Sequence, residues 1–197
     1  GTKNWITNGN SADYYIVIAQ TDKEKKHKGI NAFIVDKNWE GFEVGIKEDK
    51  LGIRGSDTHS LMFTDVKIPK ENRIGEDGFG FTFAMKTLSG GRIGIASQAL
   101  GIAAGAYELA RDYSKVRKAF GTEICNHQAI AFKLADMHTN IEAARLLVYK
   151  SALDKDQGNN YDMSSAMAKV FASQVAMEVT VEAVSYTHLR AHETLLY

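Results

Sequence analysis

The period of the hydrophobic pattern changes near residue 70 of the chain. Residues 14–19, 32–35 and 61–66 are short runs rich in β-branched and aromatic side chains, and turn-forming residues separate them. Such runs predict strands, so we expect an antiparallel β domain up to about Ile68. The lone proline, Pro69, is expected to end the last strand because it lacks a backbone N–H.

From Gly78 onward, apolar residues recur at the spacing of a helix. Between residues 130 and 148 they form one stripe, expected to face a partner helix: Ile130, Leu134, Met137, Ile141, Ala144 and Val148. A third helical segment is predicted to begin at Asp162, a favourable N-cap residue. Its expected seam consists of Met163, Met167, Val170, Gln174, Met177, Val181 and Val184.

The first helical segment, residues 79–116, repeats small residues on one face: Gly94, Ser97, Gly101 and Ala104. An interior glycine costs a helix about 1 kcal/mol relative to alanine, so we expect unusually close packing to compensate. This packing would place the helix at the centre of a bundle or at a subunit interface. The alternative is a helix broken into two near Gly90 and Gly91.

Composition narrows the class of protein. The 197 residues are 44% hydrophobic and carry 24 basic and 24 acidic side chains, so no bulk charge favours nucleic acid or a lipid surface. We expect no nucleic-acid or membrane partner, because no run reaches the ~20 apolar residues of a membrane span. Nor is secretion expected, since the start lacks the plan of a signal peptide. Gly1 opens the chain without a methionine, so we expect a piece of a longer protein.

Metal and nucleophile chemistry find little support. The six histidines show no metal-ligand spacing with the single Cys125, and His188 and His192 lack the glutamate of a zinc protease motif. Cys125 and Ser89 have no visible base beside them. We therefore expect no metal site and no nucleophilic catalysis.

Three stretches are candidates for binding a ligand. The turn after the first helix carries Arg117, Phe120 and Gln128, which suit either a helix end or a flat anionic ligand. Trp5 and Thr7 should share one strand face, where they could contact a planar cofactor or lie in the core. The third stretch is Ser89, Gly90, Gly91 and Arg92, read either as a bend that approaches a ligand or as a segment whose arginine pairs with a carboxylate. Residues 50–56 read better as a structural turn than as a phosphate loop.

Six strings in register resemble the acyl-CoA dehydrogenase family, most closely its short-chain, butyryl-CoA type members. They are GTK and WITN at the start, KLGIRGS from Lys50, GRIGIA from Gly91, RKAFG from Arg117, and HQ at His127 leading into FKLADM. The resemblance runs over residues 1–184. It implies an α+β fold: most of the middle β domain in residues 1–75, and the first three helices of a C-terminal antiparallel bundle in residues 76–184. Both domains would be incomplete.

The family binds FAD, and the resemblance implies where. Trp5 would pack against the isoalloxazine ring and Thr7 would hydrogen-bond near the flavin N5, with Ile6 between them. Arg117, Phe120 and Gln128 would reach the adenine-diphosphate end of FAD in a neighbouring subunit of a homotetramer. Ser89, Gly90, Gly91 and Arg92 would line the acyl-CoA site. Ser89 departs from the aspartate common in the family, which weakens that last assignment.

The implied reaction is the α,β-dehydrogenation of short-chain acyl-CoA in fatty acid β-oxidation, with electrons passed to an electron-transfer flavoprotein. Some members place the glutamate base where Gly91 stands; in short-chain members it lies near the C-terminus, beyond this chain. No catalytic residue is therefore expected here, and the fragment should be inactive. The parent would work in a bacterial cytoplasm or a mitochondrial matrix.

Residues 185–197 stop matching the family and read like translated adapter sequence. We expect a non-native tail, so Glu193 is not taken for the missing base. Two alternatives to the dehydrogenase remain. One is a flavin oxidase of the same fold, such as an acyl-CoA oxidase or nitroalkane oxidase; the other is a non-catalytic assembly module.

Overall fold

A computed structural model describes residues 1–187 of the chain. The chain divides into two compact units, Gly1–Lys86 and Thr87–Tyr197. The first unit is built mainly from antiparallel strands and the second from long helices. This is the α+β architecture that the sequence predicted.

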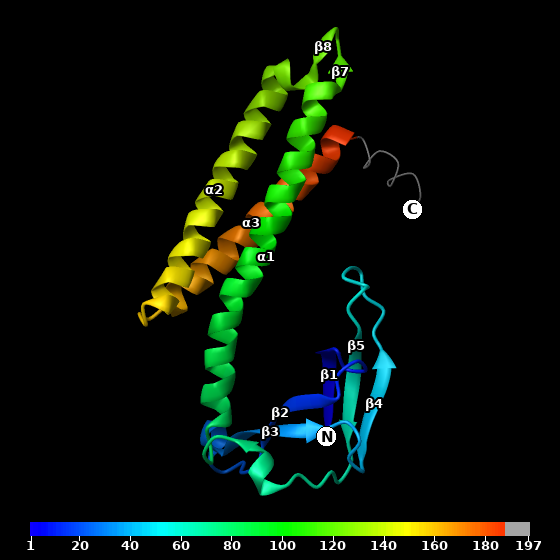
Figure 1. Ribbon diagram of the computed structural model, residues 1–197, viewed down its shortest axis with the longest axis vertical. Helices are drawn as coiled ribbons and strands as arrows, with labels where there is room; N and C mark the ends of the chain where they lie inside the picture. Colours follow the sequence, from blue (N-terminus) through cyan, green and yellow to red (C-terminus); the bar gives the residue numbers. More distant parts are fainter. Residues whose placement is uncertain (188–197) are drawn as a thin grey trace. The chain divides into compact units, whose positions relative to one another are not determined.

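Two three-stranded antiparallel sheets form the first unit (Figure 1). One sheet has the order β1-β5-β4, with β1 at Thr2–Thr7, β5 at Thr58–Phe63 and β4 at Phe42–Lys47. The other has the order β2-β3-β6, with β2 at Tyr14–Gln20, β3 at Ile30–Asp36 and β6 at Arg73–Ile74. The buried core of this unit consists of Tyr15, Val17, Val35, Phe42 and Leu61.

Two of the predicted runs lie inside β2 and β3, but the third was misplaced. The strand over residues 58–63 ends before Asp65, whose φ of 52° turns the backbone away from extended geometry. The strand therefore stops well before Pro69, which instead precedes the short 3-10 helix η2, Lys70–Asn72. Strand β4 was not predicted, because Glu43 and Gly45 dilute its apolar positions.

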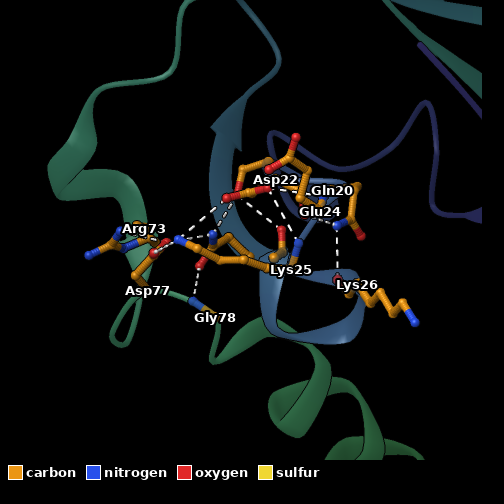
Figure 2. A network of polar contacts seen from close by, with 11 residues as sticks. Gln20, Asp22, Glu24, Lys25, Lys26, Arg73, Asp77 and Gly78 are labelled. Carbon is orange, nitrogen blue, oxygen red and sulfur yellow. Dashed lines mark hydrogen bonds and ion pairs between the residues drawn. The ribbon is translucent and has the colours of Figure 1, made fainter.

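A polar network ties the β2–β3 loop to the segment before the first helix (Figure 2). Asn31 is 2% exposed, donates to Asp77 Oδ1 at 2.9 Å and accepts from the backbone amide of Gly78 at 2.8 Å. Lys25 and Arg73 also pair with the Asp77 carboxylate, at 3.8 and 3.4 Å. Because a buried amide needs partners, Asn31 fixes this junction.

Three helices dominate the second unit: α1 at Gly80–Val116, which begins in the first unit, α2 at Gln128–Asp156 and α3 at Asp162–Thr187. A hairpin of β7, Lys118–Ala119, and β8, Thr122–Glu123, joins α1 to α2, followed by the 3-10 helix η3, Ile124–Asn126 (Figure 1). One apolar cluster holds the helices together, with buried residues from all three, including Ala103, Ile141 and Val175.

The predicted stripe on α2 is confirmed, whereas the predicted seam on α3 was wrong. Met137, Ile141, Ala144 and Val148 are all buried. On α3, the expected Met163 and Met177 are 73% and 67% exposed. The buried face is instead mostly small: Ser165, Ala168, Ala172, Val175, Val179, Ala183 and Tyr186. Small side chains let α3 approach α2 closely, and this contact outweighs the larger transfer free energy of methionine.

The small face of α1 is not closely packed within the described residues. Gly94, Ser97 and Gly101 are exposed, and a Cβ added at Gly94 or Gly101 would meet nothing within 4 Å. The helix also runs unbroken through Gly90 and Gly91, which excludes the broken-helix alternative.

Helix α1 is long and apolar enough to cross a membrane by length and composition alone, which the sequence pattern did not predict. Its Ala96, Leu100 and Ala103 lie in the core shared with α2 and α3.

Candidate functional site

Trp5 lies in a distortion of strand β1. The register with β5 shifts between Lys3 and Ile6, so β1 carries an extra residue there. Trp5 has a φ of 55°, in the left-handed region that bulky residues rarely adopt, and its side chain is 74% exposed. Such strain with an exposed indole is typical of binding sites.

Thr7 and Ile6 complete this segment. Ile6 packs against the core of the first unit, while Thr7 is exposed. A groove of about 510 Å³ runs beside them, lined by β1 and β2 residues that include Ile6, Thr7 and Tyr14. An exposed indole and hydroxyl on either side of a core residue can receive a flat ring and donate a hydrogen bond to it.

The β7–β8 hairpin presents Arg117 and Phe120. Phe120 is 99% exposed with a φ of 53°, and its ring meets His127 edge-on at a centroid distance of 6.1 Å. His127 Nε2 lies 3.0 Å from the carbonyl oxygen of Ala119, which holds the imidazole against the hairpin. A non-glycine residue in this conformation holds an unshielded aromatic ring outward from the turn.

The two cations of this hairpin differ in their pairing. Lys118 pairs with Glu123 at 3.4 Å. The pKa of Glu123 is lowered, first by a hydrogen bond from its own backbone amide and then by Lys118. Within residues 1–187, the guanidinium of Arg117 has no hydrogen bond or ion pair, and it is exposed. Arg117 is therefore free to bind an anion.

Gln128 is the first residue of α2 and is exposed. The N-cap residue, His127, makes no side-chain capping bond. The amide of Gln128 thus lies at a helix N-terminus, where backbone N–H groups and the helix dipole favour negative charge.

The third candidate stretch lies in α1 and forms no bend. Arg92 Nη1 donates to Ser89 Oγ at 3.3 Å, so the arginine pairs with the serine of its own helix turn rather than with a carboxylate. Gly91 is exposed, and a Cβ on Gly90 would lie 3.6 Å from Lys155 Nζ. Helix α1 therefore presents two cations and bare backbone on one side.

No group of three or more metal-binding side chains occurs among the described residues. Of the proposed tail, residues 185–187 continue α3, and Tyr186 is 5% exposed. Residues 188–197, including Glu193, lie outside the described part of the chain. The structure also draws attention to residues near Thr7 that we had not singled out, Asp57 and His59. Their signal in the sequence is weak, since a lone aspartate and histidine in a strand are ordinary.

Comparison with known proteins gives consistent matches over both units. The family model described as acyl-CoA dehydrogenase, middle domain, matches residues 1–66, and the model for the C-terminal domain matches residues 78–187. A short-chain specific acyl-CoA dehydrogenase of Megasphaera elsdenii is 56% identical over 184 residues, which are 93% of this chain and 48% of that protein. The mitochondrial short-chain enzyme of Mus musculus is 50% identical, covering 93% of this chain and 45% of its own length.

Solved structures agree with these matches. Butyryl-CoA dehydrogenase from Megasphaera elsdenii superposes with a TM-score of 0.93 at 54% identity, over 96% of this chain and 50% of that one. A chain in a structure described as the electron transferring flavoprotein of Acidaminococcus fermentans also gives a TM-score of 0.93, at 52% identity over 98% of this chain and 50% of that one. The chain thus spans about half the length of the relatives it matches.

Proposed function

Since the chain belongs to the acyl-CoA dehydrogenase family, we propose that it is the middle and C-terminal part of a flavin-dependent dehydrogenase of short-chain acyl-CoA thioesters. The observation that carries this proposal is the 56% identity to a short-chain specific enzyme across both units. Residues 1–75 would supply the β domain and residues 76–184 the first three helices of the bundle.

The cofactor proposed for this chain is FAD, and the exposed residues suit it. Trp5 would cover one side of the flavin ring, Thr7 would donate a hydrogen bond to it, and Ile6 would anchor the segment in the core. Their fit rests on the strained φ of Trp5 and on the exposed indole beside an exposed hydroxyl. When bound, FAD would accept the hydride that leaves the acyl chain.

The second part of the cofactor site would be the hairpin after α1. The unpaired guanidinium of Arg117 offers two parallel N–H donors to a pyrophosphate. Phe120 offers its exposed ring to a flat base, and Gln128 adds an amide at the N-terminus of α2. As the resemblance implies, this grip would act on the FAD of another subunit in a homotetramer.

The acyl-CoA site would include Ser89, Gly90, Gly91 and Arg92 on α1. The serine holds the arginine through its hydroxyl, which does the orienting expected of the aspartate common in the family. This contact places a cation beside bare helix backbone, where the polar part of a CoA thioester could lie. The side chain at position 91 is a hydrogen, so the proton-abstracting carboxylate must come from elsewhere in the protein.

The parent protein would pass electrons to an electron-transfer flavoprotein, in a bacterial cytoplasm or a mitochondrial matrix. The sharpest test joins residues 1–184 to the missing halves of the Megasphaera elsdenii enzyme. We expect this chimera to bind FAD and to lose its flavin colour on addition of butyryl-CoA, measured by absorbance under argon. Rapid reoxidation by oxygen alone would favour the oxidase alternative.

A matched chimera with Arg117→Ala should lose FAD affinity while keeping its melting temperature, because the guanidinium has no partner within the described chain. A chimera that folds and binds FAD but is not bleached by butyryl-CoA would contradict the proposed substrate. The 197-residue chain alone should not be bleached. Bleaching of that chain would refute the placement of the base outside it.

A further inference from the structure

We propose that Asp57 is a positioning residue for the flavin-binding segment: its carboxylate holds the turn after Thr7 and so fixes the exposed pair of Trp5 and Thr7. This inference rests on the proposed function of that segment.

The carboxylate of Asp57 serves three donors of one turn. Its Oδ2 accepts hydrogen bonds from the backbone amides of Asn10 at 2.9 Å and Ser11 at 3.3 Å. Its Oδ1 accepts from the hydroxyl of Ser11 at 2.8 Å. Hydrogen bonds to a charged acceptor are the strong ones in proteins, so this single side chain determines the path of the turn.

The turn lies directly beyond Thr7 and is held from its other sides as well. The backbone amide of Asn8 donates to the carbonyl oxygen of Asp57 at 3.0 Å, and Asn8 has a φ of 60°. The hydroxyl of Tyr15 donates to the carbonyl oxygens of Gly9 and Ala12, each at 2.9 Å. The turn therefore has a single conformation that depends on groups outside β1.

His59 completes the arrangement on the strand opposite. Its Nδ1 lies 3.3 Å from Asp57 Oδ2, and the imidazole side chain is 11% exposed. Gly9 is buried against it, because a Cβ at position 9 would lie 2.8 Å from the Cβ of His59. His59 pairs with Ile6 and Thr58 pairs with Thr7 across the ladder between β1 and β5.

The consequence reaches Trp5 through the bulge. The register of β1 is continuous only for Thr2–Lys3 and for Ile6–Thr7, so Trp5 is held in its strained conformation by the strand on both sides. The anchor on its C-terminal side is the turn fixed by Asp57. If that anchor is loosened, Trp5 can relax from a positive φ and its indole changes direction.

The test uses the full 197-residue chain with Trp39→Phe, which leaves Trp5 as the only tryptophan. Into it are placed Asp57→Asn, which keeps the shape but removes the charge and one acceptor, and Asp57→Ala. Asp65→Asn is the matched control, because Asp65 is an exposed aspartate of the same unit without a hydrogen bond or ion pair among the described residues. FAD affinity is read from quenching of Trp5 emission, and the exposure of Trp5 from iodide quenching without FAD.

We expect Asp57→Asn to weaken FAD binding about tenfold, the equivalent of losing a charge-assisted hydrogen bond, and Asp57→Ala to weaken it further. Iodide quenching of Trp5 should change in both variants and stay constant in Asp65→Asn. A variant with a lower melting temperature but unchanged FAD affinity and unchanged iodide quenching would show a merely structural role and overturn the proposal.

Failure of the unvaried chain to bind FAD would contradict the proposed cofactor site instead. The positioning of Trp5 would then be decided by the iodide measurement alone. Equal quenching in the unvaried chain and in Asp57→Asn would overturn it.

Discussion

At the scale of single residues, Gly78 holds a position that no other residue could take without strain. Its φ is +82°, and an added Cβ would lie 2.4 Å from the carbonyl oxygen of Lys28. Its backbone amide also donates to the buried side chain of Asn31. The left-handed conformation and the close approach both require glycine.

We therefore expect Gly78→Ala to lower the free energy of unfolding by about 1–3 kcal/mol, the usual cost of a strained backbone residue. Urea unfolding followed by circular dichroism would measure it. Gly55→Ala is the control, because nothing lies within 4 Å of an added Cβ there and its φ is not positive. An equal loss in the two variants would refute the steric argument.

Trp5 shows what residue patterns could and could not predict about the site. Alternation along a strand predicted that Trp5 and Thr7 share a face, and both side chains are indeed exposed while Ile6 packs on the core. The bulge and the positive φ of Trp5 were not predictable. They arise from the pairing of β1 with β5, which the local sequence of β1 does not contain.

At the scale of elements, the glycine face of α1 has a consequence for stability. Gly101 is an exposed residue inside the helix, and an added Cβ would meet nothing within 4 Å. Glycine there carries the backbone entropy cost without any packing in the described chain that would offset it. The face is therefore free to receive another part of the proposed assembly, where a side chain would be an obstacle.

We expect Gly101→Ala to raise the unfolding free energy of this chain by up to about 1 kcal/mol. Thermal melting by calorimetry would measure the change. Gly158→Ala provides a control of opposite sign, because it also has open space but a φ of +74°, which alanine tolerates poorly. Destabilisation by Gly101→Ala would show that the face is packed in solution.

Helix α3 explains why its seam was misassigned. Counting apolar residues favoured the methionine-rich face, since methionine transfers more apolar area than alanine. The structure buries the face of small residues because distance between helix axes, not side-chain size alone, decides the contact with α2. In the proposed parent protein, the methionine face would be covered by a segment outside this chain.

At the scale of the whole molecule, several carboxylates in both units have lowered pKa values. That of Asp57 is lowered first by the backbone amide of Asn10, that of Asp112 by the guanidinium of Arg111, and that of Asp154 by the hydroxyl of Ser164. Each favours the charged form in the folded state. The stability they contribute is therefore complete above their ordinary pKa of 3.8 and is lost as pH falls through their lower folded values.

We expect the midpoint of urea unfolding to be flat above about pH 5 and to fall steadily below about pH 4. Unfolding curves at intervals of pH would measure it. In Asp57→Asn the fall should be shallower, because one of the titrating groups is gone. A midpoint that rises on acidification would contradict the sign of these shifts.

The amino-acid sequence by itself determined the class of fold, the positions of the three helices and strands β2 and β3, and the strings that carry the family resemblance. These follow from local periodicity and from residues adjacent in the chain. Tertiary structure alone decided which face of α3 is buried, that the small face of α1 stays open, and that Asp57 and His59 support the segment of Trp5 and Thr7. Each of these depends on contacts between residues far apart in sequence, and such contacts leave no period in either partner.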